Sequence, residues 1–339
     1  MFQSVEDLDQ ALSEPTPGVV SALAQLPGAV IVLGVAGKMG ITLARMARRA
    51  LDQLGRRDQV LGIARFSSPT AAAELEKHGV RTLACDLLDR AAVQRLPEAP
   101  NVIYMAGQKF GTAHAPEQAW AANTLMPALI AERFGRSRIV AFSTGCVYSL
   151  VLVSSGGSRE DDELTPPGDY ANSCVGRERV FTYWSRKQNT SLALFRLNYA
   201  VEMRYGVLLD VALKVWRGEP VDVTMGYANV IWQRDANAFA LRCLARAASP
   251  PFVLNVTGTE TISIRAVAGR LAELLGREAR LVGQEAPTAW LNNASKAHRL
   301  FGPPTVGADQ LMEWTADWVK RGGATLSKPT HFEVRDGKY

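Results

Sequence analysis

Cysteine and histidine are scarce in this sequence of 339 residues, with four of each scattered along the chain. The cysteines show neither C-x-x-C spacing nor the density of a disulfide framework, which excludes a small disulfide-stapled secreted fold. The histidines lie far apart, without a thiol or carboxylate cluster at metal-ligand spacing, so we expect no metal site. Scattered thiols of this kind indicate a cytoplasmic protein with reduced cysteines, at Cys85, Cys146, Cys174 and Cys243.

Long apolar runs are also missing. The longest runs from Ala29 to Val35, is interrupted at Gly34, and is far too short to cross a bilayer. The first residues, MFQSVEDLD, are acidic, whereas a secretory signal starts with basic residues followed by an apolar stretch. We therefore expect no membrane association and no targeting segment.

The excess of positive charge is small, with 38 Lys and Arg against 33 Asp and Glu and a formal net charge of +5. The densest basic cluster, from Arg45 to Arg57, falls on and just after one amphipathic helical pattern, next to Asp52 and Asp58. Because no basic stripe with interleaved aromatic residues accompanies it, we expect no nucleic-acid partner.

Short apolar segments alternate regularly with amphipathic helical patterns between residues 29 and 198. This alternation predicts βαβ units and an α/β fold, a Rossmann-type doubly wound parallel sheet. The expected strands are 29–34, 59–64, 80–84, 101–105, 138–143 and 191–197, and the expected helices are 38–54, 69–78, 116–134 and 169–188.

A glycine-rich loop, Gly34-Val-Ala-Gly37-Lys38-Met39-Gly40, follows the first expected strand and opens the first expected helix. Glycines permit a tight turn and a close approach of the backbone to a pyrophosphate. The helix N-terminus offers unpaired N–H groups to the same anion. Because the loop stands between a strand and a helix, it predicts dinucleotide binding.

The expected elements divide the chain into four parts. Residues 1–27 form an N-terminal helical extension with Ser4 as a helix cap, and residues 28–198 form the NAD(P)-binding Rossmann domain. Residues 199–321, with expected helices at 206–217, 235–247, 263–275 and 309–321 and a strand near 252–256, form a smaller C-terminal α/β substrate-binding subdomain. The remaining residues, 322–339, form an extended tail.

The GxxGxxG spacing and an ordered set of later motifs resemble the extended short-chain dehydrogenase/reductase family, in its NAD-dependent epimerase/dehydratase branch. The resemblance covers about residues 28–320 and implies that Asp86 and Leu87 touch adenine and that Ala106, Gly107, Asn123 and Tyr170 also contact the cofactor. The later motifs are Asp86-Leu-Leu-Asp89, Tyr104-Met-Ala-Gly107, Asn123, Ser143-Thr-Gly-Cys-Val-Tyr148, Tyr170, Asp235-Ala, Asn255-Val-Thr-Gly and Ser295-Lys-Ala.

Thr144 and Tyr170 are the expected catalytic pair. A hydroxyl at the end of a central strand can bind a substrate oxygen beside the nicotinamide, and a tyrosine on the next helix can exchange a proton with that oxygen. The resemblance implies that Asn198 also contacts substrate. We therefore expect an NAD(P)-dependent oxidoreductase or epimerase that acts on a sugar-derived hydroxyl or keto compound.

The family pattern Tyr-x-x-x-Lys is broken here, because Cys174 stands where the lysine is expected. That lysine lowers the tyrosine pKa and binds the nicotinamide ribose, which a neutral thiol does poorly. Tyr183 and Lys187 match the pattern literally but fall at the end of the same helix, which we treat as coincidence. Either proton transfer is handled differently, with Arg177 as a possible source of charge, or the protein is a dinucleotide-binding sensor without turnover.

Cys146 leaves a further alternative open. Its place resembles that of the acid/base thiol in some nucleotide-sugar epimerases, and a small packing thiol is equally compatible with it. The arginine that grips the diphosphate in nucleotide-sugar relatives is replaced by Ala228, and the later arginine motif is missing from residues 284–293. A smaller hydroxylated substrate, such as a sugar or sugar acid, is therefore at least as compatible with the sequence.

The end of the second expected strand carries Ala64 and Arg65 where NAD-preferring sites place an aspartate. Arg65 can pair with a 2′-phosphate, so we expect NADP in preference to NAD. The resemblance also implies a homodimer that pairs through helices 116–134 and 169–188, with apolar surface from Leu125, Met126, Leu129 and Ile130.

Overall fold

The computed structural model describes residues 1–109, 111 and 114–338 and has at its centre a seven-stranded parallel sheet. The order β12-β7-β5-β4-β1-β2-β3 reverses direction between β1 and β4, which opens a crevice at the carboxyl ends of those two strands. This confirms the expected α/β class. The strands are β1 (Val30–Leu33), β2 (Val60–Ala64), β3 (Arg81–Ala84), β4 (Asn101–Tyr104), β5 (Arg138–Thr144), β7 (Leu192–Leu197) and β12 (Phe252–Val256).

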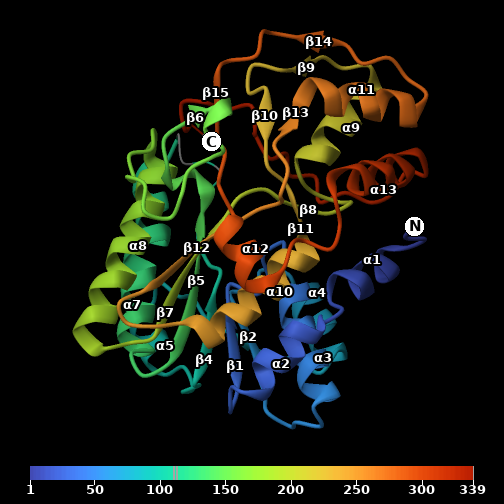
Figure 1. Cartoon of the computed structure of the whole chain (residues 1–339). Coiled ribbons are helices and arrows are strands. Elements are labelled where there is room, and N and C mark those ends of the chain that lie inside the picture. The colour runs from blue at the N-terminus through green and yellow to red at the C-terminus, as the bar shows by residue number, and fades with distance from the viewer. Residues whose placement is uncertain (110, 112–113, 339) are drawn as a thin grey trace.

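Helices cover both faces of the sheet because successive strand side chains point to opposite sides. Val30 and Val32 pack toward one group of helices, and Ile31 and Leu33 pack toward the other (Figure 1). The first group is α2 (Pro17–Ala24), α3 (Gly40–Gln53) and α10 (Gln233–Cys243), and the second is α5 (Arg90–Gln94), α7 (Met126–Arg133) and α8 (Asp169–Gln188).

The expected helix at 116–134 is divided in the structure. It consists of α6 (Pro116–Trp120), a π-helical turn at Ala121–Leu125, and α7, because Pro127 cannot donate a backbone hydrogen bond within a regular helix. The expected helices at 38–54, 69–78 and 169–188 correspond to α3, α4 (Pro69–Lys77) and α8, whereas the sequence did not indicate α5 or α12 (Ser295–Phe301).

A second apolar cluster lies above the sheet in Figure 1 and is built mainly by the helices α9 (Val207–Arg217), α11 (Ile264–Leu275) and α13 (Ala308–Lys320). Leu8 and Leu12 of α1 (Val5–Leu12) join it, and Ser4 caps that helix by accepting the Asp7 N–H at 3.0 Å. Short strands complete this region: β6 (Val151–Leu152), β8 (Ala200–Val201), β9 (Val221–Asp222), β10 (Tyr227–Ala228), β11 (Ile231–Trp232), β13 (Ile262–Ser263), β14 (Leu281–Val282) and β15 (Thr288–Ala289).

Strand β12 belongs to the main sheet, although it follows residue 198 in the chain. It pairs in parallel with β7 from Phe252↔Ala193 to Val256↔Leu197. The sheet therefore draws on both sides of the expected boundary at residue 198, and the proposed division of the chain into domains stays a prediction.

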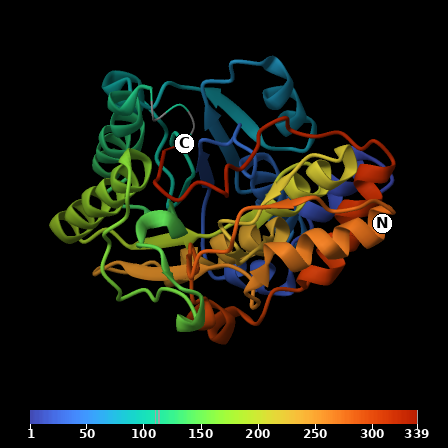
Figure 2. The same ribbon diagram turned by 90° about the horizontal axis from the view of Figure 1, so that it is seen from above.

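The C-terminal segment, residues 322–338, contains no helix or strand and crosses the molecule from the end of α13 to the start of α8 (Figure 2). Phe332 anchors it in the second apolar cluster at 1% exposure. At its end the backbone of Gly337 packs so closely on Gly168 that a Cβ on Gly168 would lie 2.5 Å from the Gly337 oxygen. The segment thus runs past the residue that precedes α8.

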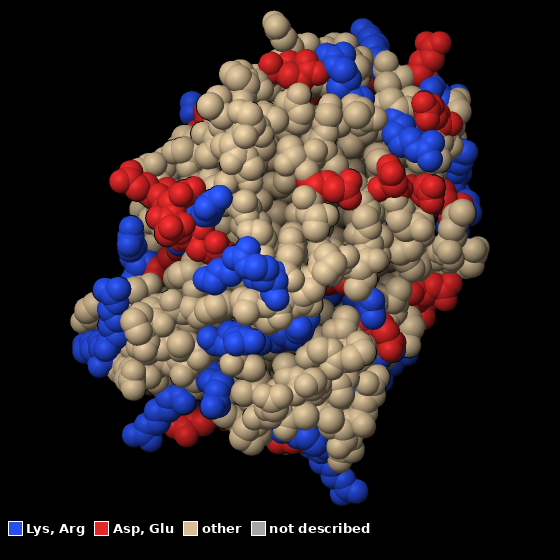
Figure 3. Space-filling model, viewed as in Figure 1, with Lys and Arg blue, Asp and Glu red and all other residues tan. Residues whose placement is uncertain are grey.

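On the face seen in Figure 3, basic side chains gather over the lower left, and a group of acidic side chains lies just above them. Within the described residues, no helix combines the length and the apolar character that a membrane span requires. All four cysteines lie in the described part of the chain, where each is buried and no disulfide joins them.

Candidate functional site

The glycine loop forms the floor of the crevice. Gly34 has φ +81°, and a Cβ on it would lie 2.7 Å from the backbone nitrogen of Ala106, so another residue type cannot occupy this position without displacing the loop after β4. A Cβ on Gly40 would meet the Val35 oxygen at 2.4 Å, which fixes the close packing at the start of α3. These glycines leave exposed backbone at a helix N-terminus and therefore fit a dinucleotide pyrophosphate.

A cleft of about 640 Å³ extends from this loop over β2 and β3. The exposed Arg65 lies at the carboxyl end of β2, and Asp86 accepts the Leu88 N–H at 2.9 Å at the end of β3. The predicted cofactor residues that line the cleft are Gly34, Gly37, Arg65, Asp86, Leu87, Ala106 and Gly107. The structure therefore brings these predicted cofactor residues together along one cleft, and their contact with a cofactor stays a prediction.

A second cavity of about 310 Å³ starts at the same glycines and lies between the ends of β5 and β7 and the start of α9. Thr144, Cys146 and Tyr170 line it, together with Asn198, whose side-chain amide donates to the Trp290 oxygen at 3.2 Å. The structure thus brings the predicted catalytic and substrate-binding residues together. Other predicted residues that line this cavity are Gly34, Gly37, Lys38, Met39 and Gly40.

Tyr170 stands in the first turn of α8, and its hydroxyl group is hydrogen-bonded to that of Thr144. Thr144 ends β5 and also accepts the Cys146 N–H at 3.1 Å, which fixes its side chain toward the cavity. Burial and the neighbouring Cys174 and Cys146 thiols raise the pKa of Tyr170 well above its usual range, and Arg177 opposes this shift. The Tyr170 hydroxyl group is therefore protonated at neutral pH.

Cys174 is completely buried below Tyr170, against Val147 and Tyr148, so its position offers no room for a solvated side chain. The nearby positive charge comes instead from Arg177, one turn further along α8. Its guanidinium donates to the Phe142 oxygen at 2.9 Å and to the Asn123 side chain, and its charge lowers the pKa of both Tyr170 and Cys174. Arg177 therefore lowers the pKa of Tyr170, as the lysine of the family pattern would, although Arg177 is not among the residues that line the cavity.

Asn123 lies at 0% exposure and is not among the described residues that line either cavity. Its amide donates to the Gln108 oxygen at 2.8 Å and to Ser173 at 3.0 Å, and its oxygen accepts from the Gln108 N–H at 3.0 Å. Asn123 thus ties the loop after β4 to α8, and its predicted contact with the cofactor stays a prediction.

A buried ion pair holds α8 against the sheet below the catalytic pair. The Glu178 and Arg196 side chains are 3% and 5% exposed, and Arg196 donates from two nitrogens at 2.9 and 2.7 Å. Ser143, next to Thr144, donates to Glu178 at 2.6 Å, and Arg196 also donates to the Tyr148 hydroxyl at 2.6 Å. This network fixes the end of β5 and therefore the position of Thr144.

Several residues of the second cavity were missed by the sequence analysis. Lys109 comes from the loop after β4, and its Nζ lies 5.9 Å from the centre of the Tyr170 ring. Tyr205 precedes α9, and Thr330 belongs to the C-terminal segment. No local motif marks these positions, because they meet only when distant parts of the chain fold together.

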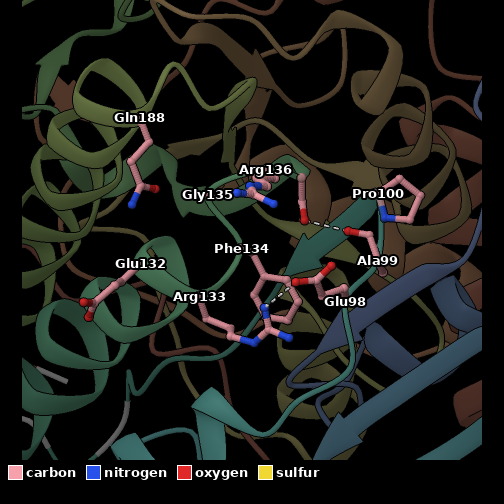
Figure 4. A pocket seen from close by; sticks show the side chains of 10 residues that line it. Glu98, Ala99, Pro100, Glu132, Arg133, Phe134, Gly135, Arg136 and Gln188 are labelled. Atoms are coloured by element: carbon pink, nitrogen blue, oxygen red, sulfur yellow. Dashed lines mark hydrogen bonds and ion pairs between the residues drawn. The ribbon is translucent and has the colours of Figure 1, made fainter.

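Two other features lie away from this crevice. Glu6, Glu74 and His78 bring ligand atoms within 4.8 Å of one another, but Arg45 is ion-paired with both carboxylates, at 3.4 and 3.2 Å, which accounts for the cluster. A hollow of about 610 Å³ lies at the amino ends of β4 and β5, the edge opposite the ligand-binding edge of an open α/β sheet (Figure 4). Its lining residues include Glu98, Arg133, Ser137 and Gln188.

Solved structures with the same fold include epimerases and a dehydratase. The UDP-glucose 4-epimerase from Thermotoga maritima, solved with UDP-glucose, is 16% identical and has a TM-score of 0.71, over 87% of this chain and 99% of that chain. The UDP-glucuronic acid 4-epimerase from Bacillus cereus, solved with NAD, is 18% identical with a TM-score of 0.71, over 86% and 99% of the two chains. The dTDP-glucose 4,6-dehydratase from Streptomyces venezuelae, solved with NAD bound, is 17% identical with a TM-score of 0.73, over 86% and 97%.

These identities are low enough that the three structures show the fold alone. No curated protein sequence matches the chain. Residues 30–201, however, match the model of a family described as the NAD dependent epimerase/dehydratase family, and they include the glycine loop, Thr144 and Tyr170. The chain therefore belongs to the NAD-dependent epimerase/dehydratase family, as the motifs from Gly34 to Tyr170 implied.

Proposed function

We propose that this protein is an NAD(P)-dependent oxidoreductase or epimerase of a small, sugar-derived hydroxyl or keto compound. The observation that carries the proposal is the hydrogen-bonded pair Thr144 and Tyr170, which lines one cavity together with the glycine loop. When bound, the nicotinamide supplies or accepts a hydride at the substrate carbon. Thr144 holds the substrate oxygen, and Tyr170 donates a proton to it or accepts one from it.

The raised pKa of Tyr170 keeps its hydroxyl group protonated at neutral pH in the free protein. In the reduction of a ketone or aldehyde, this proton goes to the carbonyl oxygen, and in the reverse oxidation the tyrosine oxygen accepts it. The test is to saturate the purified protein with reduced cofactor and follow the loss of its absorbance with a panel of keto sugars and keto acids.

The size and walls of the cavity support a small substrate. At about 310 Å³, shared with the nicotinamide ring, the cavity is at the lower end of ligand-binding cavities. Ala228 is 1% exposed within the second apolar cluster, next to Trp290 at 2%, so these positions offer apolar packing instead of a guanidinium for a diphosphate. A free sugar, sugar acid or sugar phosphate fits these observations better than a nucleotide sugar.

A sensor without turnover is the second candidate, and the burial of Cys174 in place of a lysine favours it. An epimerase that uses Cys146 is a third, because this thiol lines the same cavity as Thr144 and Tyr170. The absorbance of nicotinamide retained by the purified protein, together with turnover on the panel, distinguishes these candidate functions. A tightly retained nicotinamide with turnover indicates internal oxidation and reduction, as an epimerase requires, and retention without turnover on the panel indicates a sensor.

We expect Arg65→Asp to weaken NADP binding by about tenfold or more, because it replaces the cation that would pair with the 2′-phosphate. Binding of NAD should change much less. Arg65 is exposed in the cleft, whereas two of the three structures reported above were solved with NAD. Calorimetric titration with both cofactors measures the effect, and Arg57→Asp at the other end of β2 is the matched control. A wild-type protein that prefers NAD contradicts the assignment.

We also propose a homodimer that pairs through α6, α7 and α8. Trp120 on α6, Leu125 in the π-helical turn and Tyr183 on α8 are 40%, 52% and 57% exposed. Leu129 and Ile130 pack into the core and supply no surface. Leu125→Glu should therefore convert a dimer to a monomer, which light scattering at micromolar concentration detects. Leu152→Glu, at an exposed apolar residue on β6, should leave the dimer intact, and a monomeric wild type would rule the proposal out.

A further inference from the structure

Two lysines from distant segments line the second cavity, and a third lines a separate groove. Lys38 belongs to the glycine loop, Lys109 to the loop after β4, and Lys328 to the C-terminal segment. Lys38 and Lys109 line the cavity itself, and Lys328 lines a groove of about 500 Å³ between α9 and the C-terminal segment. The catalytic pair needs none of these ammonium groups to position its hydroxyls.

The lysines are held in place by neighbours from the same segments. Lys38 Nζ lies 3.6 Å from the centre of the Tyr205 ring, and Lys109 Nζ donates to the Thr330 backbone oxygen at 3.0 Å. Thr330 donates its N–H and its hydroxyl to Asp210 at 2.8 and 2.6 Å, which ties the C-terminal segment to α9. Contacts with neighbouring residues therefore hold Lys38 and Lys109 in defined positions.

Positive charge is crowded at this position. Burial and the charges of Lys109 and Lys328 lower the pKa of Lys38 to about 7, and Asp210 opposes the shift. Asp210 is itself partly buried and accepts both hydrogen bonds from Thr330, and the ion pair of Lys214 with Glu333 lies beside it. An anion bound among the lysines relieves their mutual repulsion and receives charge-assisted hydrogen bonds.

The lysine cluster lies away from the cleft that would hold the adenosine part of the cofactor. Lys38, Tyr205 and Thr330 line the cavity that holds Thr144 and Tyr170, and none of them lines the cleft that contains Arg65. The glycine-loop backbone already provides the N–H groups that suit a pyrophosphate. The lysine cluster thus lies where the part of a substrate remote from the reacting carbon would be.

We propose that Lys38, Lys109 and Lys328 form a binding site for an anionic group of the substrate, a carboxylate or a phosphate. The inference rests on the proposed function and narrows it to acidic sugar derivatives. In this arrangement the anion is held at the lysines while the hydroxyl or keto carbon is held at Thr144. The C-terminal segment is then part of the substrate site, because it contributes both Lys328 and Thr330.

The test uses acylation of lysines by acetic anhydride in the full chain, with and without saturating NADP, read by mass spectrometry at each lysine. Inorganic phosphate and glycolate are the anionic probes, and ethylene glycol is the uncharged one. We expect phosphate, glycolate or both to protect Lys38 with cofactor and also without it, whereas ethylene glycol does not. Lys77, exposed on α4, should be unprotected throughout.

Lys328→Gln should raise the probe concentration that half-protects Lys38 by about tenfold, because one charge-assisted contact is lost. Lys338→Gln is the matched control, since Lys338 is 75% exposed on the same segment and outside the cavity. Protection by phosphate alone identifies a phosphate substrate, and protection by glycolate alone identifies a carboxylate.

The proposal is overturned if no anion protects Lys38, if Lys328→Gln and wild type respond alike, or if NADP by itself protects Lys38 fully. The last result would assign the cluster to the cofactor. Failure of the proposed function is a separate result, because it appears as a lack of NADP binding or of turnover, neither of which enters the protection measurement on the cofactor-free protein.

Discussion

Tyr170→Phe should lower kcat by roughly a hundred- to ten-thousandfold, which is the usual contribution of a positioned general acid or base. The variant removes one hydroxyl group, the one that is hydrogen-bonded to Thr144 in the cavity. The ring keeps its packing against Val147 and Tyr148, so the affinity for cofactor should stay nearly the same. The measurement is kcat and KM on a turned-over keto compound, together with a fluorescence titration of reduced cofactor.

The chain offers a matched control for this variant in Tyr183→Phe. Tyr183 lies on the same helix and matches the Tyr-x-x-x-Lys pattern with Lys187, but its ring is 57% exposed and Lys187 Nζ lies over it at 5.5 Å, outside the cavity. Tyr183→Phe should keep wild-type turnover. If Tyr170→Phe also keeps it, the catalytic assignment of Tyr170 fails and Cys146 becomes the first candidate for the acid or base.

Glu178→Ala should lower the free energy of unfolding by about 3–5 kcal/mol, the cost of leaving a buried charge without its partner. The Arg196 guanidinium would remain 5% exposed with its carboxylate removed, and Ser143 would lose the acceptor of its 2.6 Å hydrogen bond. Urea denaturation followed by circular dichroism measures the change as a shift of the midpoint at constant slope.

Glu273→Ala is the control for this prediction. Glu273 is 72% exposed and forms an ion pair with Arg270 within one helical turn, so its loss should cost less than about 1 kcal/mol. Equal midpoints for Glu178→Ala and wild type would mean that the buried pair does not hold α8 to the sheet. The position of Thr144 would then need another explanation.

The sheet could be predicted because its signal is local. Each strand of a doubly wound sheet is a short apolar run, and each helix between them has its own period, so the residues at 30–33 or 169–188 reveal their structure without their neighbours. The glycine loop could also be predicted, because Gly34 lies so close to Ala106, and Gly40 so close to Val35, that these positions require glycine. For the same reason the sequence located Thr144 and Tyr170, which stand at the end of a strand and the start of a helix.

The rest of the cavity could not be predicted, because its walls come from contacts between distant segments. Lys109 and Thr330 are 221 residues apart in the chain and meet through one hydrogen bond. By contrast, the sequence had already offered Arg177 as a possible source of charge for Tyr170, and in the structure its charge opposes the rise in the pKa of Tyr170. The split of the 116–134 helix was missed as well, although Pro127 marked a weak point within it.

On the ribosome, the sheet strands through β12 and the glycine loop are made well before residues 328–332. A nascent chain at that stage can bury the apolar faces of the sheet and present the cleft that contains Arg65, because domains fold progressively as they emerge. The wall that Thr330 contributes appears only after Phe332 has been synthesised and has entered the second apolar cluster. Translation that stops before Pro329 would therefore release a chain that has the cleft beside the glycine loop but lacks one wall of the second cavity.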